Sequence, residues 1–363
     1  MRFPIKLFIV LLLSVCVLSP LPVCAAAKEL KVGVVLSLTG DAASNGNAML
    51  KGLELAAGEL KALGWKVELN VQDGATNPGK VTSALQFLLS RGYRFFVGPT
   101  WSFEINAARP LLERSGALAL VPAGSSDING GASKALFNLS SSRAGMLTST
   151  AKWLSERKHR KAFLLSPLGD WGRVHRELFL KALKSADVEV VGEEQFDYGI
   201  DPAALRVLML RARQKGADLL LTTSGASDLL SMLKIRDEIH WEAEMLTTED
   251  LWDVFDSGLL SQDSPMVKGT WALAVPLDAA FAAKYMEHSK EAPRMYVDKA
   301  YDALMLLAHA LERTDGSVEA VRKYLAGQSD YTGVTGAIHF DQYGDRDQGE
   351  SRVIPAFNNR SRN

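Results

Sequence analysis

Short apolar runs alternate with stretches of helical period along most of the chain. The first apolar run covers 30–36, and residues 49–60 then carry apolar side chains at helical spacing, which predicts a strand followed by a helix. The same unit recurs with Gly and Pro between its parts. The expected strands are 67–71, 95–97 and 117–121, and the expected helices are 81–89 and 105–112.

A second series of the same kind starts after the serines at 140–142. Its expected strands are 162–165, 188–191, 219–222 and 245–247, and its expected helices are 147–154, 174–183, 205–212 and 229–235. An apolar stretch at 271–275, helices at 279–288, 296–313 and 318–325, and β-like pieces at 337–340 and 353–357 complete the pattern. Such alternation is typical of parallel sheets with helices on both faces, and two series predict two α/β sheets.

The N-terminal segment 1–27 has the pattern of a secretory signal. Arg2 and Lys6 precede an apolar run at 7–18, and small residues follow at 25–27. The run is too short to cross a bilayer, which takes about 20 residues. We expect cleavage after Ala25 or Ala27. Lipoprotein anchoring at Cys24 is not expected, because Val23 stands where a lipid-attachment signal has a small residue.

Cleavage changes the chemistry of the chain. Both cysteines, Cys16 and Cys24, lie inside the signal, so the exported part has no thiol, disulfide or cysteine ligand. Loss of Arg2 and Lys6 changes 41 basic and 42 acidic residues to 39 and 42, a net charge of −3. This charge attracts neither nucleic acid nor an anionic membrane. The remaining length suits two domains.

One segment, 74–80, has the spacing of a phosphate-binding P-loop and lies between an expected strand and an expected helix. However, Val81 replaces the Ser or Thr that would hold Mg²⁺, and Pro78 lacks the N–H that would face a phosphate. We therefore interpret Asp73 and Gly74 as a turn, Asn77 as a helix N-cap and Pro78 as the first helical residue.

Other catalytic and metal-binding patterns are not found in the sequence. The six histidines lack the short spacings of zinc sites, and no Gly-x-Ser-x-Gly motif occurs. We expect neither a cofactor nor a metal, and we do not expect an enzyme. The histidines are His159, His175, His240, His288, His309 and His339.

Ligands of open parallel sheets bind beyond the carboxyl ends of the strands, where helix N-termini supply free N–H groups. The loop 123–127 follows a strand, and its small residues and hydroxyls suit a carboxylate, although a plain Gly/Ser turn is an alternative. Glu249 and Asp250 follow another strand and precede a short helix at 251–255. One of them either caps that helix or pairs with a ligand ammonium.

Together these loops resemble type I periplasmic solute-binding proteins, specifically the branched-chain amino-acid (Leu/Ile/Val) binding family of ABC importers. Each piece is weak alone, but their order and spacing over the whole exported chain are informative. The pieces are 30–35 (LKVGVV), 37–40 (SLTG), Asp73, Asn77 with Pro78, 96–99 (FVGP), 121–123 (VPA), 300–304 (AYDAL), 333–336 (GVTG), Phe340 with Asp341, and Gly344 with Asp345.

The resemblance implies two doubly wound parallel-sheet lobes, joined by three crossovers, that close by hinge motion on a ligand in the cleft. Lobe one would comprise 28–141 and 276–350, and lobe two 142–275 and 351–363. The protein would be a periplasmic monomer that delivers an amino acid or a related small carboxylate to the membrane permease subunits of an ABC importer. A periplasmic sensor that reports to a receptor is the alternative function.

The resemblance also implies site residues. Ser102 and the loop of Ala123, Gly124 and Ser125 match the family's carboxylate-binding positions, Glu249 matches its ammonium partner, and Trp171 matches an aromatic wall on lobe two.

Several positions depart from the family pattern. Trp101 and Thr76 stand where some members have a disulfide, Asn45 stands where an aromatic residue is frequent, and 224–226 is small where a second aromatic is usual. These departures indicate a pocket of different shape. The alternatives for the ligand therefore include a bulkier or aromatic amino acid and a carboxylate without an amino group.

Overall fold

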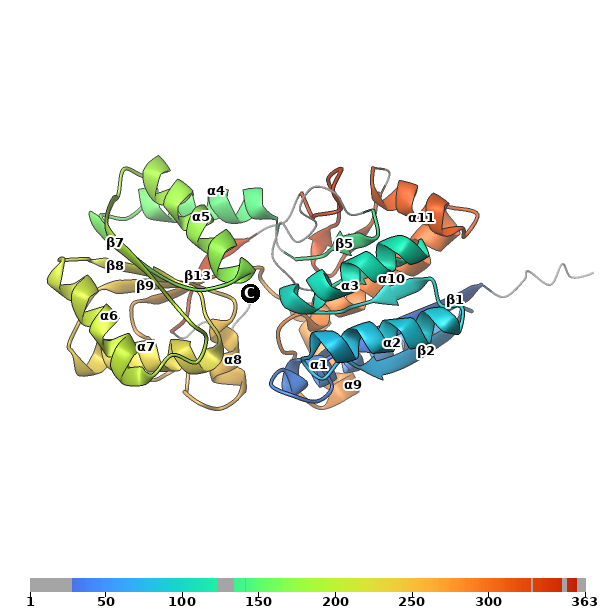
Figure 1. Cartoon of the computed structure of the whole chain (residues 1–363), viewed down its shortest axis with the longest axis horizontal. Helices are drawn as coiled ribbons and strands as arrows, with labels where there is room; N and C mark the ends of the chain where they lie inside the picture. Colours follow the sequence, from blue (N-terminus) through green and yellow to red (C-terminus); the bar gives the residue numbers. More distant parts are fainter. Residues whose placement is uncertain (1–27, 123–133, 141, 328, 348–350, 358–363) are drawn as a thin grey trace, which may run out of the picture.

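The computed structural model describes residues 28–122, 134–140, 142–327, 329–347 and 351–357, and it contains two lobes side by side (Figure 1). Each lobe is built on its own sheet, with helices on both faces. The predicted α/β class with two mostly parallel sheets is confirmed.

The sheet of lobe one has the strand order β2-β1-β3-β4-β5 and is parallel throughout. Alternate residues of its strands face opposite sides: Val35 and Phe96 pack with α2 and α3, whereas Val34 and Val97 pack with α1 and α10. Its elements are β1 (Glu29–Leu36), α1 (Ala43–Ala62), β2 (Lys66–Asp73), α2 (Pro78–Ser90), β3 (Phe95–Val97), α3 (Ser102–Ser115), β4 (Leu118–Val121), β5 (Leu136–Asn138), α9 (Ala279–Ser289), α10 (Val297–Glu312) and α11 (Val318–Leu325), with the small hairpin β11 (Thr332–Gly333) and β12 (Gly336–Ala337).

The sheet of lobe two has the order β13-β10-β9-β8-β6-β7, and only its edge strand β13 runs antiparallel. Helices α4 and α5 pack on one face, and α6 and α7 on the other. Its elements are α4 (Arg143–Ser155), β6 (Lys161–Pro167), α5 (Asp170–Ser185), β7 (Glu189–Phe196), α6 (Pro202–Gln214), β8 (Leu219–Thr222), α7 (Ala226–Glu238), β9 (Glu244–Thr248), α8 (Leu251–Asp256), a 3₁₀ helix (Pro265–Val267), β10 (Thr270–Ala274) and β13 (Arg352–Pro355).

We propose that the chain crosses between the lobes near 141, 275 and 350. Strand β5 precedes the first of these positions in the lobe-one sheet, and β6 follows it in the lobe-two sheet. Strand β10 precedes the second position, and α10, which packs on α1, follows it. Strand β13 then returns to pair with β10 after the third.

Residues 74–80, which have the spacing of a P-loop, form a turn and the start of a capped helix, as the sequence predicts. The Asn77 side chain accepts hydrogen bonds from the backbone N–H groups of Gly79 (2.9 Å) and Lys80 (3.1 Å), and Pro78 is the first residue of α2. The Asp73 carboxylate accepts from the backbone N–H of Leu38 (2.9 Å), which ties this turn to the loop after β1.

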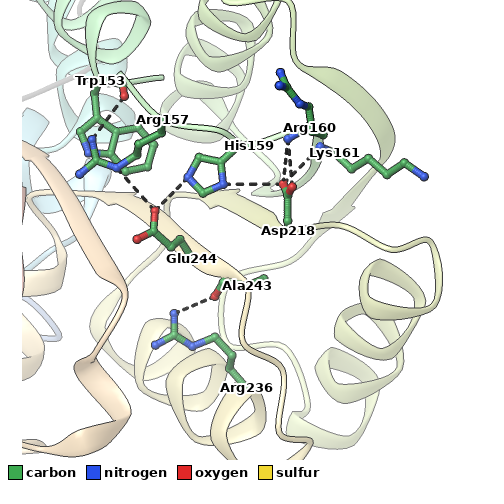
Figure 2. Close-up of polar contacts among 9 residues, drawn as sticks. All are labelled: Trp153, Arg157, His159, Arg160, Lys161, Asp218, Arg236, Ala243 and Glu244. Atoms are coloured by element: carbon green, nitrogen blue, oxygen red, sulfur yellow. Dashed lines mark hydrogen bonds and ion pairs between the residues drawn. The ribbon is translucent and has the colours of Figure 1, made fainter. Parts of the chain in front are cut away.

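At the end of the lobe-two sheet where strands β6, β8 and β9 begin, a polar network joins these three strands (Figure 2). His159 Nε2 lies 2.9 Å from Glu244 Oε2, and its Nδ1 lies 3.7 Å from Asp218 Oδ1. The hydrogen bond from His159 is the main cause that lowers the pKa of Glu244. Arg157 also pairs with Glu244 and lies 4.1 Å from the ring centre of Trp153. The side-chain partners of His159 therefore lie where the strands begin, away from the carboxyl ends of the strands.

The cap at Asn77 gives the first testable prediction. Asn77→Ala removes two hydrogen bonds to the first turn of α2 and is expected to lower the free energy of unfolding by about 1 kcal/mol. Urea denaturation measures this change, and Lys80→Ala, at an exposed position of the same turn, is the control. Equal stability of the Asn77→Ala and Lys80→Ala variants would contradict the capping role.

Candidate functional site

The carboxyl ends of the two sheets meet where the lobes face each other. Helices α3 and α5 begin there on opposite sides and approach each other (Figure 1). Asn106 of α3 donates from Nδ2 to Asp170 Oδ2 of α5 at 2.9 Å. Two helix N-termini, each with a positive field, therefore face the same space.

A buried ion pair joins the lobes at this edge. Lys299, in the first turn of α10, places Nζ 3.2 Å from Oε1 and 3.4 Å from Oε2 of Glu249, which follows β9. The Lys299 side chain is only 2% exposed, and that of Glu249 is 15% exposed. Both carboxylate oxygens of Glu249 are thus engaged by a cation from the other lobe.

Aromatic rings surround this pair on the side of lobe one. Lys299 Nζ lies 4.7 Å from the ring centre of Tyr296, and Trp101 meets Tyr296 edge to face at 5.9 Å. Tyr296 has a φ of 65°, in the left-handed region that a bulky side chain seldom adopts. Such strain is concentrated at functional positions, and here it holds the ring between Trp101 and Lys299.

A second contact between the lobes joins Asn45 of α1 to Asp253 of α8. Asn45 donates from Nδ2 to Asp253 Oδ2 at 3.0 Å. Burial raises the pKa of Asp253 to about 6, although the hydrogen bond from Asn45 opposes the rise. The Asp253 carboxyl is therefore more easily protonated than an ordinary surface carboxyl.

Asp250 is the centre of a hydrogen-bond network within lobe two. Its Oδ2 accepts from Trp171 Nε1 (3.0 Å) and from the hydroxyls of Thr223 (3.3 Å) and Thr248. Burial raises the pKa of Asp250 to about 7, and the carboxylates of Glu249 and Asp253 add to the rise. Asp250 stands at the N-cap position of α8, but its side chain makes no capping hydrogen bond.

The structure places the predicted site residues as follows. Asn45, Trp101, Trp171 and Glu249 lie in the contacts just described, and half-buried Ser102 is the first residue of α3. Ala123, Gly124 and Ser125 lie outside the described residues. The binding roles of these residues stay predictions. Trp171, the predicted aromatic wall of lobe two, also makes a polar contact: its N–H donates to Thr223 Oγ1 at 2.7 Å.

Four side chains near the contacts between the lobes keep buried polar atoms without a hydrogen-bond partner in the described part of the chain. Trp101 Nε1 is a donor, Asn45 Oδ1 and Asp253 Oδ1 are acceptors, and the Thr100 hydroxyl can be either. Buried polar atoms normally have partners, so an unpaired group marks a position where a ligand or a water molecule can bind.

A small cavity lies beside Trp171 and Glu249. This cavity, of about 10 Å³, is lined by Trp171, His175, Thr248, Glu249, Leu273, Ser140 and Met146. That volume holds about one water molecule. A broader pocket of about 710 Å³ is lined by residues of α4 and by Asp347, Ser351, Arg352 and Val353.

Sequence reasoning missed Lys299, Tyr296 and Asp253. Lys299 lies in helix α10, and the residues next to it in the sequence, Val297, Asp298 and Ala300, are also buried. A lysine in such a position was the signal that could have identified it, since lysine is rarely fully buried without a partner.

Comparison with known proteins agrees with this arrangement. A family model described as "Periplasmic binding protein" matches residues 29–353. The chain belongs to this family. The chain is similar to the Leu/Ile/Val-binding protein of Citrobacter freundii, with 21% identity and 92% of each chain covered. The family resemblance predicted from the sequence is thereby confirmed, and the chain is a solute-binding protein rather than an enzyme.

Solved structures of periplasmic binding proteins share the fold. The leucine-binding protein of Thermotoga maritima has a TM-score of 0.76 and 17% identity, with 90% of this chain and 98% of that chain covered. A solute-binding protein of an ABC transporter from Rhodopseudomonas palustris BisB5, in complex with 3,4-dihydroxybenzoic acid, has a TM-score of 0.76 and 18% identity, with 92% and 99% covered. At these identities the likeness concerns the fold.

The described residues contain no group of three or more His, Cys, Asp or Glu side chains placed to hold a metal ion. Among the helices of the same residues, none has the length and apolar character needed to span a membrane.

The raised pKa of Asp250 gives a prediction for stability. In the folded protein this carboxyl holds its proton to about pH 7, whereas an unfolded Asp loses it near pH 4. The folded state then binds more protons, so this group makes stability fall as pH rises, by about 1.4 kcal/mol per pH unit between roughly pH 4 and 7.

Asp250→Asn keeps the neutral shape and removes the titration, so the variant is expected to lose less stability between pH 5 and 7.5 than the unaltered protein. Thermal unfolding over that range measures the difference. Asp187→Asn, at an exposed position of the same lobe, is the control. Parallel pH profiles for Asp250→Asn and the unaltered protein would contradict the assignment.

Proposed function

We propose that the protein captures an amino acid or a related small carboxylate between its lobes and delivers it to the permease subunits of an ABC importer. The observation that carries this proposal is the set of polar contacts between the lobes at the carboxyl ends of both sheets. Lys299–Glu249, Asn45–Asp253 and Asn106–Asp170 each join a residue of lobe one to a residue of lobe two. Contacts of this kind form on closure and break on opening.

Helix N-termini and a buried N–H group support a carboxylate ligand. The N-termini of α3 and α5 face the space between the lobes, and their positive fields favour an anion. Trp101 Nε1 adds a buried donor. We further propose that Ser102, Trp101, Trp171 and Asn45 contact this ligand, together with Ala123, Gly124 and Ser125.

The family and the N-terminal sequence support a place of action outside the cytoplasm. We propose that residues 1–27 direct export to the periplasm, where the protein acts as a monomer. A ligand-binding protein of this kind signals its loaded state by closure, because the ligand binds the closed form more tightly than the open form. Permease subunits would then recognise the closed form.

A thermal-shift screen of the purified protein tests ligand capture. The panel contains the twenty amino acids and a set of aliphatic and aromatic carboxylates. A ligand at about 100 times its Kd is expected to stabilise the protein by about 2.7 kcal/mol, and small-angle scattering is expected to show a smaller radius of gyration with that ligand. Stabilisation without any change of radius would contradict closure of the lobes.

The role of Trp171 is tested by replacing its ring. Trp171→Ala is expected to raise the Kd of the ligand found in the screen about tenfold or more, because stacking area is lost. Trp171→Phe, which keeps an aromatic ring but loses the N–H bonded to Thr223, is expected to have a smaller effect. An unchanged Kd in the Ala variant would place this side chain outside the ligand site.

Uptake by cells distinguishes transport from the sensing alternative. Deletion of the gene is expected to reduce the uptake of the radiolabelled ligand identified in the screen, with restoration by the unaltered gene. Full uptake together with a lost transcriptional response to that ligand would favour the sensor.

A further inference from the structure

We propose that the site between the lobes selects a small carboxylate without an α-ammonium group, because Lys299 already occupies the carboxylate of Glu249. This inference rests on the proposed solute-binding function and specifies its ligand class. It reverses the role that the sequence predicts for Glu249, since the cation that this carboxylate binds belongs to the chain itself.

Lys299 balances the charge of the Glu249 carboxylate without a ligand. Lys299 Nζ contacts both oxygens of Glu249, at 3.2 and 3.4 Å, and its side chain is 2% exposed. A ligand ammonium on the same carboxylate would place two cations on one anion, in a position from which water is nearly excluded. An uncompensated buried charge is costly, so an amino acid would lose affinity here.

Displacement of Lys299 is also unfavourable. The first turn of α10 holds this side chain beside Glu249, so its effective concentration exceeds that of a ligand in solution. Among the contacts that Lys299 makes with the described residues, a displaced ammonium would keep the face of Tyr296, at 4.7 Å. A cation–π contact alone is weaker than a buried, doubly contacted ion pair.

The groups that are left for a ligand match a neutral or anionic molecule. Asp250 is engaged by Trp171 and two threonine hydroxyls, and Asp253 Oδ2 accepts from Asn45. The remaining acceptors, Asn45 Oδ1 and Asp253 Oδ1, can be satisfied by a hydroxyl, which donates a hydrogen bond without bringing a charge. The ligand carboxylate would face the N-termini of α3 and α5.

Isothermal titration calorimetry with matched pairs tests the inference. The probes are L-phenylalanine against 3-phenylpropanoate and L-leucine against 4-methylpentanoate, which differ only at the amino group, together with 3,4-dihydroxybenzoate. At least one of the three carboxylates without an amino group is expected to bind. Where that carboxylate belongs to a matched pair, its Kd is expected to be at least about tenfold lower than that of the amino acid of the pair.

Lys299→Met frees Glu249 with little change of side-chain length, so this variant is expected to gain affinity for the amino acid of each pair. Lys284→Met is the matched control, because Lys284 pairs with Glu59, a residue of lobe one, at 2.7 Å. The control is expected to keep the preference of the unaltered protein. If the Lys299→Met variant does not fold, the matched pairs on the unaltered protein decide alone.

The other outcomes are distinguishable. An amino acid that binds the unaltered protein as tightly as its counterpart would overturn the inference and leave the solute-binding function in place. No binding by any of the five probes, or in the thermal-shift panel, would contradict the proposed function itself and the inference with it.

Discussion

The ion pair between Lys299 and Glu249 is the contact on which the arrangement of the site depends. It joins a helix of lobe one to the end of a strand of lobe two, and it is almost fully removed from water. A buried pair is costly to break by loss of one partner, because the other charge stays unpaired. In our proposal it therefore helps to hold the lobes in this arrangement and limits the charges that a ligand can bring.

The rest of the architecture explains why these two side chains can meet. Parallel strands present all their carboxyl ends at one edge of a sheet, and in each lobe this edge faces the other lobe. The helices that follow the strands begin at the same edge, so Trp101 and Trp171 flank the space with their N–H groups. The polar network around His159 lies at the far end of the lobe-two sheet, where it joins strands without contacting a ligand site.

The sequence allowed prediction of features that depend on local pattern. The cap at Asn77 was predictable because the side chain bonds to N–H groups two and three residues away. Strand β7 runs to Phe196, beyond the predicted 188–191. The prediction ended too early because Glu193 and Glu194 interrupt the apolar run, whereas an edge strand of a sheet can carry such charged residues. The partner of Glu249 was not predictable, because Lys299 is 50 positions away and in the other lobe. Glu249 was a candidate together with Asp250 from its place after a strand, and the family resemblance then favoured it as the ammonium partner. Trp171 was proposed as an aromatic wall only through the family resemblance.

A double-mutant cycle on Lys299 and Glu249 tests the central claim most directly. The free energy of unfolding in urea, without ligand, is measured for the unaltered protein, Lys299→Met, Glu249→Gln and the double variant. The account predicts that the double variant is more stable than the sum of the single effects by about 1 kcal/mol or more, as expected for charges in contact. Additive effects, with a coupling free energy near zero, would show that the two side chains do not form this pair in solution.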